Sequence, residues 1–102
     1  MKFVYVKNAA DDDALLPIDK ITLIETAAED VIVYGNLGNF RQVTITLSVT
    51  DGKESIVAKA LAEAIAGSSS NVITLGDDVA SSYFHPDVTA VEGLTIDVSQ
   101  AS

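Results

Sequence analysis

The sequence predicts an α+β fold that is mainly β: a small, strongly bent antiparallel sheet, or a partly open barrel, with one α-helix. Residues 43–50 alternate strictly between apolar and hydroxyl side chains, and only residues 54–66 space their apolar side chains as a helix does. The strand-like segments mostly follow one another directly along the chain, which favours antiparallel pairing. With 102 residues, the chain is expected to form a single domain, 1–102, around one core.

Three strands are expected before residue 40. Phe3–Val6 is β-branched and aromatic, and Leu16–Glu25 is predicted as one strand that Pro17 places at a sheet edge or a strand start. Val31–Tyr34 is apolar at every position, which is typical of a strand covered on both faces or exposed at an interface. Turns are expected between these strands, at residues 27–30 and 35–39.

Val43–Thr50 is expected to be a half-buried strand. Its register is well specified because a slip by one residue would turn the apolar side chains to water and bury the hydroxyls. Further strands are expected at Asn71–Gly76 and Leu94–Val98, with a loop over Asp77–Pro86 and a loose end at Ser99–Ser102.

The helix is expected over Glu54–Ala66, with Gly67 as a left-handed C-cap. Its start has two interpretations. Asp51 and Glu54 match a capping box, whereas Asp51-Gly52 is also a hairpin turn that would delay the helix until about Ala58. The predicted buried face consists of Ile56, Ala60, Leu61, Ala64 and Ile65.

The composition excludes several classes of function. Fifteen carboxylates against six scattered Lys and Arg residues give a net charge of −9, which repels phosphate and anionic lipid, so neither nucleic acid nor a membrane is expected as a partner. The chain has no cysteine, which removes disulfides and thiolate chemistry. No secretory signal or membrane span can be read, and a soluble protein is expected.

Two groups of side chains are candidates for ligand binding. Asp11–Asp13, with Asp19 nearby, forms an acidic loop that is either solvated or a cation site, although it lacks the spacing of an EF-hand. The segment from Asp77 to Asp87 contains the only histidine and two aromatic residues beside carboxylates. Its ligand candidates are Asp77, Asp78, His85 and Asp87.

No motif supplies a nucleophile, a cofactor cradle or a metal-ligand set, so no catalytic, cofactor-binding or metal-binding residue is assigned and an enzyme is not expected. Nearly half of the residues are apolar, and one small core does not readily bury that much apolar surface. The residues expected at an interface are Val31, Val33, Tyr34 and Phe40.

The set of Phe3–Val6, Leu16–Ile21, Val43–Val49, Asp51–Glu54 and the alanine-rich helix resembles small uncharacterised proteins of marine phage and metagenomic sequence. Their bent sheets are similar to the Sm-like, or SH3-like, small β-barrel. The resemblance implies ring assembly through edge strands, often with RNA bound by basic and aromatic loop residues. This chain departs from that pattern because it is acidic and has no basic residue in the turn after Tyr34, which opposes RNA binding.

The leading hypothesis is a non-enzymatic structural or assembly protein that forms homo-oligomers, associated with a phage or virion and located in the virion or the host cytoplasm. Other structural proteins are possible partners, and no cofactor is expected. The alternative is a small-ligand or cation-binding module that uses residues 77–87.

Overall fold

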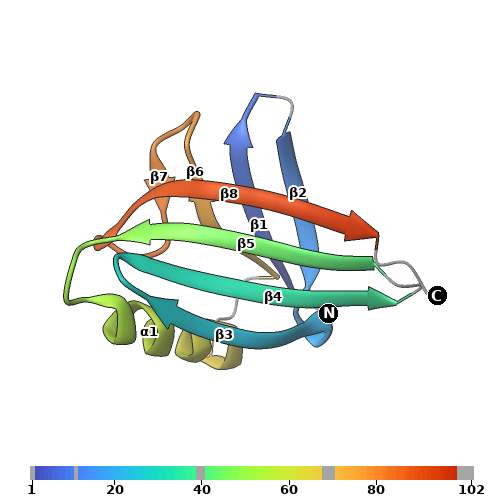
Figure 1. Cartoon of the computed structure of the whole chain (residues 1–102), viewed down its shortest axis with the longest axis horizontal. Coiled ribbons are helices and arrows are strands. Elements are labelled where there is room, and N and C mark those ends of the chain that lie inside the picture. The colour runs from blue at the N-terminus through green and yellow to red at the C-terminus, as the bar shows by residue number, and fades with distance from the viewer. Residues whose placement is uncertain (1, 11, 39–40, 68–70, 99–102) are drawn as a thin grey trace.

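The computed structural model describes residues 2–10, 12–38, 41–67 and 71–98. Within these ranges the chain forms two four-stranded sheets and one α-helix (Figure 1). Sheet A has the strand order β2-β1-β6-β7 and sheet B the order β3-β4-β5-β8. The predicted class is confirmed, and the strands are divided between two sheets that do not close into a barrel. The elements are β1 (Phe3–Ala9), β2 (Asp12–Pro17), a 3₁₀ helix η1 (Ile18–Lys20), β3 (Ile21–Ala27), β4 (Asp30–Gly38), β5 (Arg41–Val49), α1 (Glu54–Gly67), β6 (Val72–Asp77), β7 (Ser82–Tyr83) and β8 (Val88–Val98).

Sheet B is antiparallel throughout, and β5 lies at its centre. The alternation along β5 behaves as predicted, because the apolar side chains from Val43 to Val49 are buried while the hydroxyl side chains between them stay partly exposed. The predicted reversal at residues 27–30 is confirmed, with Glu29 at a φ of 62°. The buried side chains of β5 are Val43, Ile45, Leu47 and Val49.

The predicted turn at residues 35–39 begins too early, because β4 continues to Gly38. Gly35 stays in the strand because Leu16 of sheet A packs against it, and a Cβ there would lie 3.2 Å from Leu16 Cδ2. Gly38, with a φ of 79°, takes the left-handed conformation that the reversal needs.

The single strand predicted over Leu16–Glu25 is wrong. β2 ends at Pro17, which has no N–H to continue the ladder, and η1 then carries the chain from sheet A to sheet B before β3 begins at Ile21. The Ile18 N–H donates to the Lys2 carbonyl at 3.1 Å, which fixes the crossing point beside the start of β1.

The pairing of β1 with β6 is parallel, in an otherwise antiparallel structure. Val4 lies beside Ile73, so the two strands are far apart in the sequence. The crossover that joins this parallel pair is long: after β2 the chain passes through β3, β4 and β5 of sheet B and then α1 before it returns to sheet A as β6.

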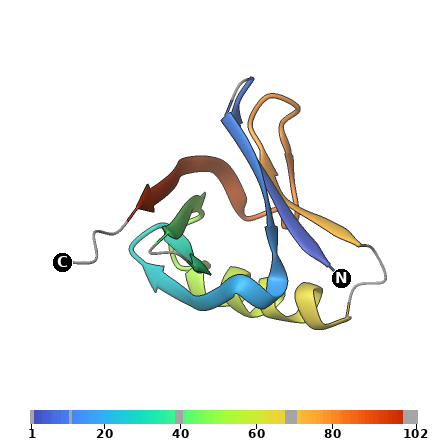
Figure 2. The ribbon, with the colours of Figure 1, turned by 90° about the vertical axis from the view of Figure 1, so that its right-hand side faces the viewer.

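The core lies between the sheets, whose strands run across each other, and α1 covers one open side (Figures 1 and 2). Every side chain that is buried in the described residues is apolar. The fully buried side chains are Val4, Val6, Val31, Val33, Ile45, Leu47, Val57, Leu61 and Leu75.

The helix begins at Glu54, so the predicted turn at Asp51-Gly52 forms without delaying the helix until Ala58. Asp51 is not the N-cap of a capping box, because the residue after it, Gly52, has a φ of 85° and is not helical. Leu61 is buried as predicted, and Ala60, Ala64 and Ile65 are partly buried. The prediction is wrong at Ile56, which is 50% exposed, and Val57 is buried in its place. The prediction of Gly67 as a left-handed C-cap is wrong. Among the glycines of the described residues, Gly38 and Gly52 have a positive φ and Gly67 does not.

The last strand, β8, is longer than predicted and begins at Val88. Residues 99–102, predicted as a loose end, lie outside the described residues. Among the helices of the described ranges, none is long and apolar enough to cross a membrane.

Candidate functional site

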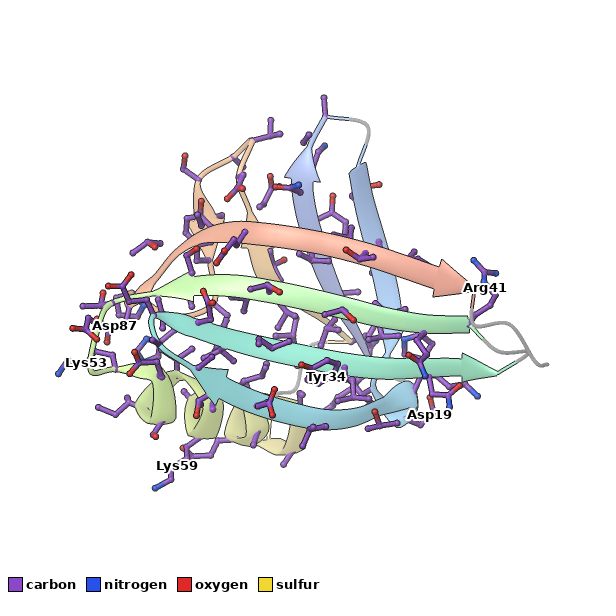
Figure 3. The ribbon with its side chains drawn as sticks, in the orientation of Figure 1. Asp19, Tyr34, Arg41, Lys53, Lys59 and Asp87 are labelled. Carbon is purple, nitrogen blue, oxygen red and sulfur yellow. The ribbon has the colours of Figure 1, made fainter. Side chains whose placement is uncertain are left out.

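Two of the residues expected at an interface are in the core. Val31 and Val33 are completely buried on the inner face of β4, opposite Leu47 and Ile45 of β5. They cannot form an exposed contact in this fold, and this part of the prediction is wrong. Tyr34 lies on the outer face of sheet B (Figure 3), and Phe40 lies outside the described residues.

Tyr34 lines a shallow groove on the outer face of sheet B, with a volume of about 470 Å³. Its hydroxyl donates to Glu25 Oε1 at 3.0 Å, and this bond raises the pKa of Tyr34. Leu23, which is 51% exposed, is the largest apolar side chain in the groove. The remaining walls are polar and come from Thr22, Asn36, Gln42 and Thr44.

A second hollow, of about 390 Å³, lies beside the turn between β3 and β4 and is acidic. Glu29, Asp30 and Glu92 contribute carboxylates to it, and Ser48 donates its hydroxyl to Glu92 Oε2 at 3.2 Å. Asp30 raises the pKa of Glu92 through a hydrogen bond and through its charge. The two carboxylates therefore repel each other when both are ionised.

We expect Glu92→Gln to raise the melting temperature at pH 7 and to leave it unchanged near pH 4. A carboxyl whose folded pKa is raised stabilises the fold below its unfolded pKa, and this contribution is lost as the pH rises through the folded pKa. Glutamine does not ionise, so the variant does not lose this stabilisation as the pH rises to 7. Thermal unfolding at both pH values measures the effect, and Glu63→Gln, on the exposed side of α1, is the control. An equal gain at both pH values would contradict the explanation.

The ligand candidates Asp77 and Asp78 shape the turn after β6. Asp77 Oδ1 accepts the N–H groups of Val79 and Ala80, each at 3.0 Å, and the predicted loop contains the short strand β7. Asp78 Oδ1 accepts the Tyr83 hydroxyl at 2.7 Å and the Val91 N–H at 2.9 Å, which ties the turn to β8 and raises the pKa of Tyr83.

His85 and Asp87 contact each other beyond that turn. His85 Nδ1 accepts the Asp87 N–H at 3.1 Å and lies 3.7 Å from Asp87 Oδ2. A ring nitrogen that accepts a hydrogen bond carries no proton, so the second contact is not an ion pair in this form. The Asp87 carbonyl accepts the Thr50 N–H at 2.9 Å, which joins this pair to the end of β5.

Of the four candidates of residues 77–87, His85 and Asp87 contact each other, whereas Asp77 and Asp78 accept hydrogen bonds from other residues. No group of three or more His, Cys, Asp or Glu side chains in the described part of the chain is arranged to hold a metal ion.

The acidic segment at residues 11–13 is not wholly a loop, because Asp12 and Asp13 belong to β2. Asp13 Oδ2 accepts the Tyr5 hydroxyl at 2.9 Å across the β1–β2 pair, and this bond raises the pKa of Tyr5. Asp11 lies outside the described residues. Asp19 is exposed in η1.

The outer face of sheet A carries apolar side chains that the sequence analysis did not single out. Strand register places Phe3 between Pro17 and Val72, and Tyr5 between Leu15 and Thr74, so these residues form two adjacent rows. Leu15 is 56% exposed and Val72 is 47% exposed. The alternation along β1 was the available signal, since Val4 and Val6 point to the core and their neighbours point away.

The free edge of β8 is a second surface that sequence reasoning missed. Thr46 pairs with Gly93 and Leu47 with Val91, so Glu92 forms a bulge, after which Gly93–Val98 runs regularly beside β5. β8 is the last strand of sheet B, so the other side of this stretch, here called the β8 edge, has no strand partner among the described residues.

Comparison with known proteins finds no protein-family model that matches the chain, no similar curated protein and no similar solved structure.

Proposed function

We propose that the protein is a non-enzymatic structural protein that assembles with further copies of itself. The observation that carries the proposal is uncovered apolar surface on both sheets: four large side chains on strands are 45 to 56% exposed. Exposed apolar residues that stand alone are common, but strand pairing here sets Leu15 beside Tyr5 and Val72 beside Phe3. The four exposed side chains are Leu15, Leu23, Val72 and Ile96.

Charge restricts how copies can meet. Each copy carries a net charge of −9, so two copies repel at long range, and a contact must bury apolar area while keeping carboxylates apart. Burial of apolar surface contributes about 25 cal/mol per Å², and this gain is what opposes the repulsion. The apolar rows of sheet A and the β8 edge both meet this requirement, since Leu94–Val98 contains a single charged residue, Asp97.

We expect a mass above the 10.7 kDa of one protomer in size-exclusion chromatography with light scattering, at protomer concentrations from about 10 to about 200 µM. The oligomer should grow more populated when NaCl rises from about 20 to about 200 mM, because screening shortens the Debye length to below about 10 Å. A strictly monomeric profile would contradict the proposal. A mass that falls as salt is added would contradict the role of repulsion.

Two further points remain proposals. A role within a virion is supported by the resemblance of the sequence to phage proteins with Sm-like sheets. A ring, the other form of assembly that this resemblance implies, would join two different edges head to tail instead of two copies of one edge. Binding of a cation or small ligand at residues 77–87 has weaker support, because Asp77 and Asp78 already accept hydrogen bonds that shape the turn. If Ca²⁺, Mg²⁺ and Zn²⁺ leave the melting temperature unchanged, that alternative is to be dropped.

A further inference from the structure

We propose that copies meet through the β8 edge: Gly93–Val98 pairs antiparallel with the same stretch of a second copy about a two-fold axis. The two sheets B, of four strands each, then become one continuous eight-stranded sheet. The inference rests on the proposed function, since it requires a homo-oligomer, and it adds the surface and the geometry.

Edge strands offer unpaired N–H and C=O groups that recruit another strand unless something prevents it. The structure has four such edges: β2 and β7 in sheet A, and β3 and β8 in sheet B. β7 is only two residues long. β2 ends at Pro17, which has no N–H to donate to a further strand.

β3 is also obstructed. α1 packs against β3 and β4, along the side on which a further strand would approach (Figure 1). The pairing of β3 with β4 is interrupted between Ile21 and Leu23, and the Thr22 hydroxyl at this irregularity donates to the Tyr34 carbonyl at 3.3 Å. A bulge and a flanking helix are two ways in which proteins protect an edge.

The β8 edge has neither form of protection. Within Gly93–Val98 the sequence has no proline and no lysine, and the bulge at Glu92 lies before it. Figure 2 shows the end of β8 apart from β1 and β2, on the other side of the molecule. No strand of the described residues pairs with its other side.

Ile96 marks the missing neighbour most directly. It pairs with Val43, so both side chains lie on the core face of sheet B. Val43 is 3% exposed, whereas Ile96 is 45% exposed. Ile96 is thus open although it lies on the core face, and a second β8 alongside would cover it.

The β8 edge is complementary to itself. In antiparallel pairing about a two-fold axis, opposite residues share a face, so the axis passes through one residue position. With the axis at Thr95, Ile96 meets Leu94 of the other copy and Asp97 meets Gly93. With the axis at Ile96, Ile96 meets its own counterpart and Asp97 meets Thr95. Both registers cover Ile96, and neither sets the two Asp97 positions directly opposite each other.

The outer faces of the sheets are the competing surfaces. A contact between these faces would use side chains alone and would form no main-chain hydrogen bonds. If the groove around Tyr34 packed against the same groove of a second copy, it would bring two Glu25 carboxylates together. The rows of sheet A adjoin Lys7, Asp13 and Asp77 in the next row, so face-to-face packing there would have to accommodate these charges.

The first test compares three lysine substitutions at similarly exposed apolar sites. Ile96→Lys places a charge on the core face of the β8 edge, Leu15→Lys on the outer face of sheet A, and Leu23→Lys in the groove of sheet B. We expect Ile96→Lys to raise the dissociation constant at least roughly tenfold and the other two to change it less than about threefold. Light scattering over a dilution series measures the constants, and melting curves of the diluted variants check the fold.

The second test uses the unsubstituted backbone. Amide hydrogen exchange within Gly93–Val98 should slow as protein concentration rises, while exchange in β3 should not change.

The chain contains no cysteine, so single cysteines report proximity without interference. Thr95→Cys or Ile96→Cys should give a covalent dimer with a short bis-maleimide, and Leu15→Cys should not.

The outcomes separate the inference from the proposed function. A monomeric wild-type protein overturns both. An oligomer that survives Ile96→Lys, or that shows no concentration-dependent protection of Gly93–Val98, overturns the β8 pairing and leaves homo-oligomerisation standing. If Ile96→Lys fails to fold, the exchange and crosslinking results decide.

Discussion

Replacing Leu47 with alanine is expected to lower the free energy of unfolding by about 3 kcal/mol, because truncation removes apolar burial and leaves a cavity between the sheets. Leu47 is completely buried at the centre of sheet B, between Val31 of β4 and Val91 of β8. For a domain of this size, each kcal/mol corresponds to roughly 4 to 8 °C of melting temperature. Urea denaturation and thermal unfolding measure the loss.

The matched control for this change is Leu15→Ala, which makes the same truncation where the leucine is 56% exposed. Its cost should stay below about 1 kcal/mol. Equal losses at the two sites would show that burial does not set the cost and would contradict the core described here.

A methyl group at Gly76 is expected to cost about 1 to 3 kcal/mol, because the site has no room for it. A Cβ there would lie 2.7 Å from Val91 Cγ2 and 3.0 Å from Tyr83 Cδ1. Gly76 is buried where β6, β7 and β8 meet, so relief of the clash must move Val91 or separate the strands. Urea denaturation of Gly76→Ala measures the cost.

A double mutant identifies the clash as the cause. Gly76→Ala combined with Val91→Ala should be more stable than the sum of the two single losses predicts, by about 0.5 kcal/mol or more. Gly67→Ala is the control, since a Cβ at Gly67 meets nothing within 4 Å and its φ is not left-handed. Additive losses in the double mutant would contradict the clash.

Local patterns in the sequence predicted the elements whose side chains differ sharply between two faces. The alternation of residues 43–50 identified β5 and the residues it buries, because a one-residue slip would reverse its faces. The bounds of α1 were also predictable, and so was its buried face apart from the choice of Val57 over Ile56. The helix is apolar or alanine-rich on most sides, so the sheets it packs against select Val57 and Leu61.

Arrangement in space was less accessible, because it depends on contacts between distant residues. Pro17 signalled a boundary, yet whether it begins or ends a strand depends on Lys2, whose carbonyl accepts the Ile18 N–H. Val31 and Val33 formed an apolar run that fits a core strand and an interface equally well, and only the position of sheet A assigns them to the core.

The candidate sites followed the same division. Clusters of acidic residues were visible in the sequence, but the partners of Asp78, which are Tyr83 and Val91, come from two separate strands. Ile96 gave no signal in the sequence, since an alternating apolar residue in a last strand looks the same whether or not another strand lies beside it.

The parallel pairing of β1 with β6 has a consequence for how the chain reaches this state during translation. β1 and β2 are synthesised before the other strands of this fold and can form a hairpin at once, but a two-stranded ribbon is at best marginally stable in water. β6, which pairs with the other side of β1 in the folded protein, is synthesised only after α1. Until then the β1–β2 hairpin has one side of β1 unpaired. Nascent chains stalled before residue 72 should therefore be prone to mispairing and should depend on chaperones more than the released protein does.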